Sequence, residues 1–326
     1  MVIKEQVLNI LETKKGSYIS GEEIAEKLNV SRNSVWKAIK ALKNEGHIIN
    51  ASTNKGYILS EKSNVFTAQS VYANLSAELR EKLKITVVPT VGSTNTELKT
   101  IAERGGSDGT VLIALEQTAG RGRLGRSFYS PKDTGLYMSV LLRPDFSASE
   151  ALNITACAAV AAAKAIDIVA GVETKIKWVN DIYLNGKKVC GILTEASIDF
   201  ESGGLNYAVL GIGINLTTNN FPAELKDIAS SISNAEEDYR SFISAQFLNV
   251  FFDYYKNLTN CEFLSEYRRR SMLNNKKITF TRGNETFDGT VTGIDDELRL
   301  VVKLADGKEM AFSSGEVQLV KGDIVK

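Results

Sequence analysis

Apolar residues in the first 45 positions recur at the spacing of helices. The third of these helical segments has apolar residues at i, i+3, i+4 and i+7, which are Val35, Ala38, Ile39 and Leu42. Ser20 and Ser31 precede the second and third segments and suit the N-cap position, and Glu23 can complete a capping box with Ser20. Two short β-like runs follow at residues 47–51 and 56–59. Three helices and a hairpin in this order predict a winged helix-turn-helix.

Positive charge is concentrated in the second half of this segment. Residues 1–30 carry a net charge of −1, whereas residues 31–60 carry +4. The excess falls on the third helix and the hairpin, which make groove and phosphate contacts in such domains. We therefore predict DNA binding; the alternative is a small interaction domain with a solvated basic face. The candidate DNA-contacting residues are Ser31, Arg32, Asn33, Trp36, Lys37, Lys40 and Lys55, with Arg32, Asn33 and Lys37 favoured.

The connector that follows combines helix and strand patterns. Residues 61–84 predict one amphipathic helix, with apolar positions at Val71, Leu75, Leu79 and Leu83. A short strand at 85–88 should end at the proline that follows it. Ser93 and Thr94 can both cap the next helix, and Thr94 can form a capping box with Glu97. A helix start beside a strand end is also a good place to bind polar ligand atoms.

The centre of the chain is predicted to contain a buried sheet. Apolar runs at 110–115, 135–143 and 209–216 predict strands, and an alanine-rich run at 149–169 predicts a long helix. Asn185-Gly186 stands between two β-like runs and is the strongest short hairpin signal. Glycines inside a strand, as in the last of these runs, often mark the close approach of a ligand or of another backbone.

Three glycines alternate with three arginines directly after the first of these strands. The stretch reads Glu116-Gln117-Thr118-Ala119-Gly120-Arg121-Gly122-Arg123-Leu124-Gly125-Arg126. Glycine lets the backbone approach a ligand closely, and arginine offers a rigid fork of donors for phosphate or carboxylate. We predict a loop that folds over an anion and is mobile without it. The alternative is a solvated basic surface loop.

Composition narrows the class of protein. A chain of 326 residues predicts two or three domains, and its formal net charge of zero gives no global signature of polyanion binding. Three widely spaced cysteines, a single histidine and no CxxC predict a reduced, cytoplasmic setting without disulfides or zinc. Cys157 is interpreted as a core residue, since no histidine is available as its base. The N-terminus lacks the pattern of a signal peptide, and the apolar stretch at 156–163 is too short to span a bilayer.

The end of the chain changes from helical to alternating patterns. Residues 242–257 and 263–271 predict two helices with aromatic residues packed inward. From residue 277 onward, short alternating runs are separated by turn signals. Several short strands of this kind predict a small β-barrel.

Five motifs, in this order, resemble those of the bifunctional biotin–protein ligase/biotin-operon repressor family. They are Gly92-Ser93-Thr94-Asn95, residues 116–126, Lys177-Trp178-Val179-Asn180-Asp181, Lys187-Lys188-Val189-Cys190-Gly191-Ile192-Leu193 and Gly211-Ile212-Gly213-Ile214-Asn215-Leu216. The family usually has proline where Val179 stands; valine restores an N–H and frees the backbone there. The resemblance implies an α+β multidomain chain: a winged helix-turn-helix at 1–63, a class II synthetase-like catalytic domain with a mixed sheet at 64–274, and an SH3-like β-barrel at 275–326.

The resemblance also implies a two-step reaction with biotin and MgATP as substrates. Biotin carboxylate attacks the α-phosphate to give biotinyl-5′-AMP, and a lysine of a biotin carboxyl carrier protein then attacks the acyl-adenylate. Catalytic roles fall to Lys188, Arg121 and Arg123. The expected biotin-binding residues are Ser93, Thr94, Asn95, Gln117, Gly120, Arg121, Gly122, Arg123, Lys188, Gly191, Gly211 and Gly213. The expected nucleotide-side residues are Arg123, Arg126, Trp178, Asn180, Asp181 and Asn215, with Asp181 as a candidate magnesium ligand or orienter.

The implied partners are operator DNA, a second copy of the chain and the carrier protein of acetyl-CoA carboxylase or pyruvate carboxylase. In this view the adenylate orders the Gly/Arg loop and favours a homodimer, which presents two winged helices to a palindromic operator. Two alternatives stay open: a DNA-binding, biotin-sensing regulator without ligase activity, and a lipoate-type acyl ligase. Intact Arg121, Arg123 and Lys188 argue against the first, and the winged helix with the Gly/Arg loop argues against the second.

Overall fold

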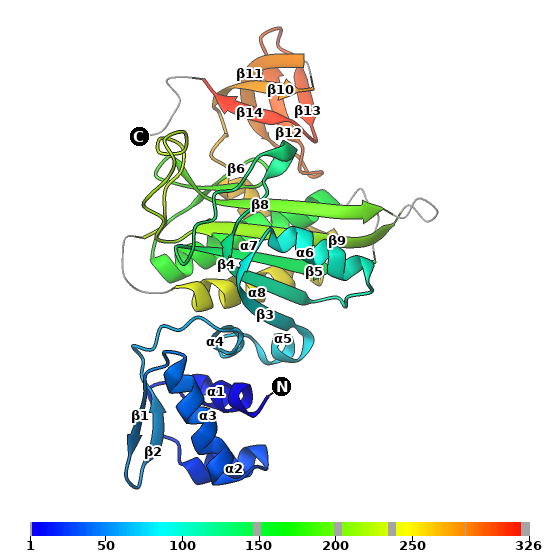
Figure 1. Cartoon of the computed structure of the whole chain (residues 1–326). Coiled ribbons are helices and arrows are strands. Elements are labelled where there is room, and N and C mark those ends of the chain that lie inside the picture. The colour runs from blue at the N-terminus through cyan, green and yellow to red at the C-terminus, as the bar shows by residue number, and fades with distance from the viewer. Residues whose placement is uncertain (1, 146–150, 199–203, 234–238, 284, 321–326) are drawn as a thin grey trace. The chain divides into compact units, whose positions relative to one another are not determined.

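Two compact units make up the computed structural model of this chain. The structure describes residues 2–145, 151–198, 204–233, 239–283 and 285–320. One unit comprises Met1–Arg80 with Glu236–Ala245, and the other comprises Glu81–Ala235 with Gln246–Lys326. Figure 1 shows that the first unit is mainly helical, whereas the second contains a large sheet and a small all-β domain.

The first unit contains three helices and a two-stranded hairpin in the order predicted for a winged helix-turn-helix. Its core is formed by apolar residues of all three helices, among them Val7, Leu11, Ile24, Val35 and Leu42. The hairpin strands pair antiparallel. The elements are α1 (Ile3–Thr13), α2 (Gly21–Leu28), α3 (Arg32–Asn44), β1 (Ile49–Ser52), β2 (Gly56–Leu59) and α4 (Ala68–Tyr72).

The serine caps form as predicted, but the capping box at α2 is only half formed. The Ser20 hydroxyl accepts a hydrogen bond from the backbone N–H of Glu23 at 3.0 Å, and Ser31 caps α3 in the same way. The carboxylate of Glu23 instead pairs with Lys14 and Lys27. These two ammonium groups offer charged donors, which a carboxylate prefers to a backbone N–H.

The predicted single helix of the connector is wrong: two short helices, α4 and α5 (Ala77–Lys82), take its place. The side chain of Asn74 donates to the carbonyl of Ser70, and the Ser76 hydroxyl accepts from the backbone N–H of Leu79. Polar side chains of this kind compete with the helix for backbone groups and break it. All four apolar positions are nevertheless buried, namely Val71, Leu75, Leu79 and Leu83.

The second unit is organised around a mixed seven-stranded sheet with the order β3-β4-β5-β9-β8-β7-β6. Only the β3–β4 pair is parallel. This agrees with the mixed sheet expected for the catalytic domain. The elements are β3 (Lys84–Val91), α6 (Thr94–Glu103), β4 (Thr110–Gln117), η1 (Arg123–Gly125), β5 (Gly135–Leu142), α7 (Ala151–Ala170), β6 (Lys175–Lys177), β7 (Asp181–Leu184), β8 (Lys187–Ile198), β9 (Leu205–Asn215), η3 (Leu258–Asn260) and α9 (Leu264–Arg270). Helix α8 (Arg240–Tyr255) belongs to the first unit up to Ala245 and to the second unit from Gln246 onward.

Helices cover both faces of this sheet. Figure 1 shows α6 on one face and α7 on the other, and every residue of β5, an interior strand of the sheet, is buried. Within the described residues, one helix segment, Leu152–Ala170, is long and apolar enough to cross a membrane, although 67% of that window is buried in the fold. The sequence-based estimate of the apolar stretch was therefore too short. Burial against the sheet explains the apolar character, and Cys157 is fully buried there, as predicted.

Two local predictions near the sheet turn out differently. Strand β3 runs through Pro89 instead of ending before it. The register skips this proline, and β3 lies at the edge of the sheet, where a missing N–H leaves no neighbour unpaired. The turn between β7 and β8 is confirmed, since Asn185 and Gly186 both have positive φ (50° and 77°), as a type I′ turn requires.

The C-terminal β domain forms a five-stranded antiparallel sheet with the order β13-β12-β11-β10-β14. Phe280 and Phe312 are fully buried in it with ring centroids 4.0 Å apart. These short antiparallel strands agree with the small β-barrel expected from residue 277 onward. The strands are β10 (Lys277–Arg282), β11 (Glu285–Ile294), β12 (Leu300–Leu304), β13 (Glu309–Phe312) and β14 (Glu316–Leu319).

Candidate active site and DNA-contacting face

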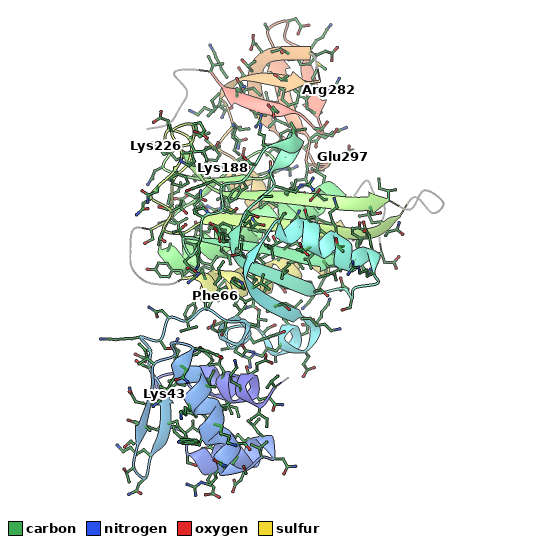
Figure 2. All side chains as sticks on the ribbon, viewed as in Figure 1. Lys43, Phe66, Lys188, Lys226, Arg282 and Glu297 are labelled. Carbon is green, nitrogen blue, oxygen red and sulfur yellow. The ribbon has the colours of Figure 1, made fainter. Side chains whose placement is uncertain are left out.

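One pocket of about 260 Å³ in the second unit collects most of the predicted site residues. They come from the start of α6, the Gly/Arg loop, the segment before β7, and strands β8 and β9; Figure 2 labels Lys188, which belongs to β8. The lining residues that the sequence predicted are Ser93, Thr94, Asn95, Gln117, Arg121, Gly122, Arg123, Arg126, Trp178, Asn180, Asp181, Lys188, Gly191, Gly211 and Gly213.

Two predicted residues do not line this pocket. The Asn215 side chain donates to the carbonyl of Ser230 at 3.2 Å and holds the following loop. A Cβ on Gly120 would lie 2.4 Å from the carbonyl oxygen of Phe128 and 2.6 Å from the hydroxyl of Ser130. Gly120 therefore allows two parts of the loop to approach each other, and neither Gly120 nor Asn215 is part of the pocket wall.

A neutral hydrogen-bond network forms one end of the pocket. Gln117 Oε1 accepts from the backbone N–H of Thr94 at 2.9 Å and from its hydroxyl at 3.1 Å. The hydroxyl of Ser139, a residue that the sequence analysis missed, lies 2.7 Å from Thr94 Oγ1 and 2.6 Å from Asn95 Oδ1. Its one hydrogen serves one of these acceptors at a time. Ser93, Thr94, Asn95 and Ser139 are all buried, so this end offers fixed, uncharged donors and acceptors.

The capping box predicted for α6 does not form. Ser93 occupies the N-cap position but makes no capping hydrogen bond with its side chain, and the hydroxyl of Thr94 points to Gln117 instead. The hydroxyl of Thr94 thus belongs to the pocket network, and Ser93 lines the pocket.

Strand glycines at the base of the pocket are covered by side chains of the chain itself. A Cβ on Gly211 would lie 2.1 Å from Asn95 Oδ1, and one on Gly213 would lie 2.5 Å from the ring of Phe128. We expected these glycines to leave room for the tail of biotin. In this structure the room is taken by Asn95 and Phe128, so close packing within the protein already requires glycine there.

Four of the cations that line the pocket have a polar partner. Lys188 Nζ lies 2.6 Å from Asp181 Oδ1, and Arg121 lies 3.2 Å from Glu195. Arg123 donates to Asn180 Oδ1 at 3.0 Å. The fourth cation, Arg126, pairs with Glu316 of the C-terminal β domain.

These contacts hold the cations around the pocket without neutralising them fully. The side chain of Arg121 is 47% exposed and that of Arg126 is 70% exposed, and exposed ion pairs are worth little in water. A strongly charged ligand such as a phosphate can therefore replace the internal partners.

Glu195 is held in its charged form at the edge of this group. Burial raises its pKa, but hydrogen bonds from Asn95 and Lys99 and the charge of Arg121 outweigh burial, and the net pKa is lowered. The sequence analysis did not select Glu195, although it stands two positions after Leu193, the last residue of the fourth motif.

Lys177 is a third residue that the sequence analysis missed, after Ser139 and Glu195. It lines the pocket at the end of β6, and burial lowers the pKa of its ammonium group, opposed by the charge of Asp181. Nearby Lys188 and Arg126 lower the pKa further. Its place beside Trp178 in the third motif was the signal that could have identified it. The other lining residues that the sequence analysis did not select are Leu124, Ser127, Phe128, Ile192, Leu193, Ile212 and residues 315–318.

The segment after β6 is fixed from several sides. Trp178 Nε1 donates to the carbonyl of Leu298 at 2.9 Å, and the peptide bond between Trp178 and Val179 is cis. Asn180 Nδ2 donates to the carbonyl of Ile192 at 2.7 Å. These contacts leave the Oδ1 of Asn180 to accept from the Gly/Arg loop.

The pocket fits magnesium only as an ion that arrives with phosphates. Among the described residues, no group of three or more His, Cys, Asp or Glu side chains is placed to hold a metal. Asp181 and Glu316 are the carboxylates among the lining residues, and both are paired with cations. Mg²⁺ commonly binds through one or two carboxylates together with substrate phosphates.

The predicted DNA-contacting residues lie on one exposed surface of the first unit. Arg32, Asn33, Trp36, Lys37 and Lys40 are all exposed on α3, while Lys55 is exposed in the β1–β2 turn. Lys40 Nζ lies 5.4 Å from the centroid of the Trp36 ring, which is itself 51% exposed. The hydroxyl of Ser31 is used as the cap of α3.

Family comparisons agree with this division of the chain. Residues 4–58 match an HTH domain, residues 87–215 match the biotin/lipoate A/B protein ligase family, and residues 275–320 match the biotin protein ligase C-terminal domain. The fold and the pocket thus define a ligase-type catalytic domain joined to a helix-turn-helix.

Comparisons with individual proteins identify the family within this class more closely. The chain is 34% identical to the bifunctional ligase/repressor BirA of Bacillus subtilis over 321 residues, which cover 96% of this chain and 97% of that protein. It is 25% identical to BirA of Escherichia coli, covering 93% and 94% of the two chains. The structure of biotin protein ligase from Aquifex aeolicus in complex with biotin and ATP superposes with a TM-score of 0.63 at 27% identity, covering 73% of this chain and 98% of that one. The chain belongs to the family of bifunctional biotin–protein ligase/repressors.

Proposed function

We propose that this protein ligates biotin to a lysine of a biotin carboxyl carrier protein and represses biotin genes in response to biotinyl-5′-AMP. The observation that carries the proposal is the pocket, in which a buried neutral network and a group of cations, contributed by separate segments, face one cavity of about 260 Å³. Membership of the ligase/repressor family agrees with this combination.

The neutral end of the pocket suits the uncharged ureido ring of biotin. Thr94, Asn95 and Gln117 offer donors and acceptors that are already fixed by mutual hydrogen bonds, so little ordering is needed on binding. A charged end would leave an unpaired ion against this ring, at a high cost in desolvation.

The cationic end suits the junction of carboxylate and α-phosphate. A biotin carboxylate oxygen attacks the α-phosphorus, the bond to the bridging oxygen of pyrophosphate breaks, and pyrophosphate leaves. Lys188, Arg121 and Arg123 stabilise the negative charge that gathers there, and this chemistry depends mainly on positioning and charge. In the second step, the carrier lysine amine attacks the acyl carbon, loses a proton, and displaces AMP.

The nucleotide side comprises Arg126, Trp178, Asn180 and Asp181. Magnesium, when bound, offsets phosphate charge, and Asp181 is the carboxylate placed to hold or orient it beside Lys188. Asn215 stays outside this set as a residue that holds the neighbouring loop.

The ligase proposal is tested by incubating the full chain with labelled biotin, ATP and a biotin carrier domain. We expect label on the carrier only when ATP is present. Labelling with lipoate in place of biotin would identify a lipoate-type ligase, and DNA binding without any label transfer would identify a regulator without ligase activity.

Repression requires that the ligand-bound form prefer DNA. We propose that the adenylate favours a homodimer of this chain, which is expected to be cytoplasmic and to bind a palindromic operator. Addition of biotin and ATP should lower the protein concentration that half-saturates operator DNA. An affinity for operator DNA that does not change when biotin and ATP are added would contradict this coupling of ligand binding to DNA binding.

A further inference from the structure

Helix α9 contacts the segment 174–179 at three successive points, and this segment leads directly into the pocket residues. Arg270 Nη1 donates to the carbonyl of Thr174 at 3.3 Å. The backbone N–H of Met272 donates to the carbonyl of Ile176 at 3.0 Å, and the hydroxyl of Tyr267 donates to the carbonyl of Val179 at 3.0 Å. Helix α9 and the two residues after it therefore contact the segment near its start, at its middle and at its end.

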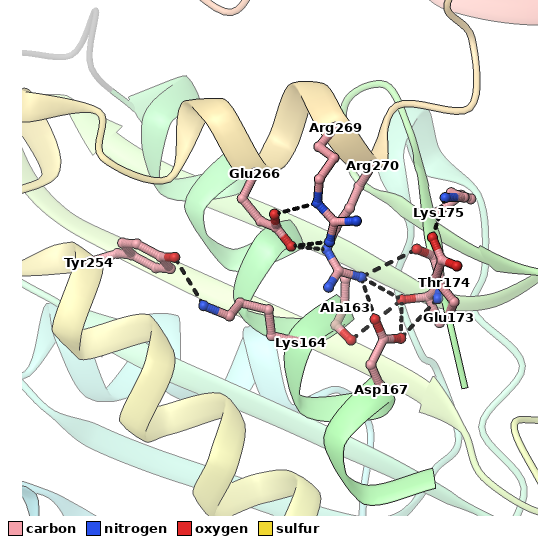
Figure 3. A network of polar contacts seen from close by, with 10 residues as sticks. All are labelled: Ala163, Lys164, Asp167, Glu173, Thr174, Lys175, Tyr254, Glu266, Arg269 and Arg270. Carbon is pink, nitrogen blue, oxygen red and sulfur yellow. Dashed lines mark hydrogen bonds and ion pairs between the residues drawn. The ribbon is translucent and has the colours of Figure 1, made fainter. Parts of the chain in front are cut away.

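The first contact point is reinforced by a buried ionic network, which Figure 3 shows. Arg270 is 5% exposed and binds Glu266 through Nε at 2.7 Å and Asp167 through Nη1. Asp167 Oδ1 in turn accepts from the backbone N–H and the hydroxyl of Thr174, both at 2.8 Å. A guanidinium with this many donors fixes the relative positions of α7, α9 and the residue before β6.

The third contact point lies beneath the site itself. Tyr267 is fully buried, and burial raises the pKa of its phenol, so the hydroxyl keeps its proton and serves as a donor. Its electrostatic surroundings include Arg123 and Asp181, which lower and raise that pKa respectively. The phenol thus holds the backbone between Trp178 and Asn180, both of which line the pocket, although Tyr267 itself does not line it.

We propose that Tyr267 is a positioning residue for the nucleotide side of the site, assisted by Arg270. Its hydrogen bond to Val179 sets the backbone from which Trp178, Asn180 and Asp181 extend. This inference rests on the proposed function, which assigns these three residues to the nucleotide. None of the five motifs contains Tyr267 or Arg270, so the role comes from tertiary contact alone.

The test compares Tyr267→Phe with Tyr254→Phe in the full chain. Each variant loses one phenolic hydroxyl that makes a hydrogen bond, since Tyr254 accepts from Lys164 at 3.2 Å, as Figure 3 shows. We expect Tyr267→Phe to raise the KM for ATP about fivefold to tenfold, the effect of losing one buried hydrogen bond. The KM for biotin should change less than twofold, and Tyr254→Phe should change neither value.

Trp178 provides a readout independent of activity. The chain has two tryptophans, so Trp36→Phe leaves Trp178 as the only one. In that background, Tyr267→Phe should shift the emission maximum of Trp178, whereas Tyr254→Phe should leave it unchanged.

Two results of the kinetic comparison would overturn the role of Tyr267. One is an unchanged KM for ATP together with unchanged Trp178 emission. The other is an equal rise in both KM values with a lowered melting temperature, which indicates general loss of structure.

Calorimetric titration of wild-type protein with ATP separates the role of Tyr267 from the proposed function. No binding at all would overturn the proposed function and this role together. Wild-type binding that Tyr267→Phe leaves unchanged would overturn this role alone.

Discussion

The proposed catalytic pocket and the proposed DNA-contacting face both contain basic residues, but the structure holds these residues differently. On α3, Lys37 and Lys40 extend into solvent from one local helix, and Arg32 pairs with Glu22 in an ion pair whose side chains are 71% and 61% exposed. In the pocket, Lys188 and Arg123 come from separate parts of the second unit and are already held by Asp181 and Asn180. The comparison teaches that exposed cations on one helix suit a long polyanion, whereas cations oriented beforehand by the fold suit a small ligand.

The largest effect should come from removing a cation of the pocket. Lys188→Ala should lower the rate of biotin-dependent exchange of pyrophosphate into ATP by about 100-fold or more, because one donor at a developing charge is commonly worth that much. Exchange of labelled pyrophosphate measures this directly. Lys187→Ala is the matched control. The ammonium group of Lys187 donates to the carbonyl of Lys226, and Lys187 does not line the pocket. Equal exchange in wild type and Lys188→Ala would remove Lys188 from the mechanism.

Close packing at the base of the pocket gives the next effect. Gly211→Ala would place a Cβ 2.1 Å from Asn95 Oδ1, which must then move out of the neutral network. We expect the KM for biotin to rise about tenfold, in line with the cost of overpacking a buried site. Gly293→Ala is the control, because nothing lies within 4 Å of its Cβ position. An unchanged KM for biotin would show that Asn95 does not bind biotin in this arrangement.

A single cation on the DNA-contacting face should matter less. Lys37→Ala should weaken operator binding about threefold to tenfold and reduce the slope of log affinity against log salt by about 1, as expected for the loss of one phosphate contact. Fluorescence anisotropy across a salt series measures both quantities. Lys4→Ala serves as the control, because Lys4 pairs with Glu45 and was not predicted to contact DNA. Loss of ligase activity in Lys37→Ala would contradict the separation of the two surfaces.

The smallest effect concerns the pH dependence of the first unit. His47 is 4% exposed, and burial lowers its pKa below the ordinary value of 6.5, with Glu45 opposing. The unfolded chain therefore binds a proton more readily, and the stability from neutral His47 is present above pH 6.5 and lost as pH falls below it.

Urea unfolding measured by Trp36 emission in a Trp178→Phe chain follows the first unit alone. We expect the midpoint to fall between pH 7.5 and about 5.5 in this chain, and His47→Gln to flatten that change. Glu12 is a useful internal contrast, because burial raises its pKa. Protonation of Glu12 at lower pH therefore stabilises the folded unit, whereas protonation of His47 destabilises it. A midpoint that does not depend on pH would contradict the role of His47.

Local sequence determined the first unit almost completely. Helix spacing, two serine caps and the placement of charge predicted α1–α3, the hairpin and the exposed basic residues, because a helix face depends on neighbours three and four positions away. Where local polar side chains competed with the backbone, as at Asn74 and Ser76, the same reasoning failed.

The motifs located most of the pocket lining, but only the tertiary structure decided what each residue contacts. The pocket network and lining also include Ser139 and Phe128, which lie outside all five motifs. They include Lys177 as well, which is only the first residue of the third motif. Asn215 and Gly120 belong to motifs, yet they face other parts of the chain. Sequence alone therefore determined the elements and the candidate chemistry of this protein. The seven-stranded sheet decided which side chains meet, because contacts such as Asn95 with Gly211 join residues that are remote along the chain.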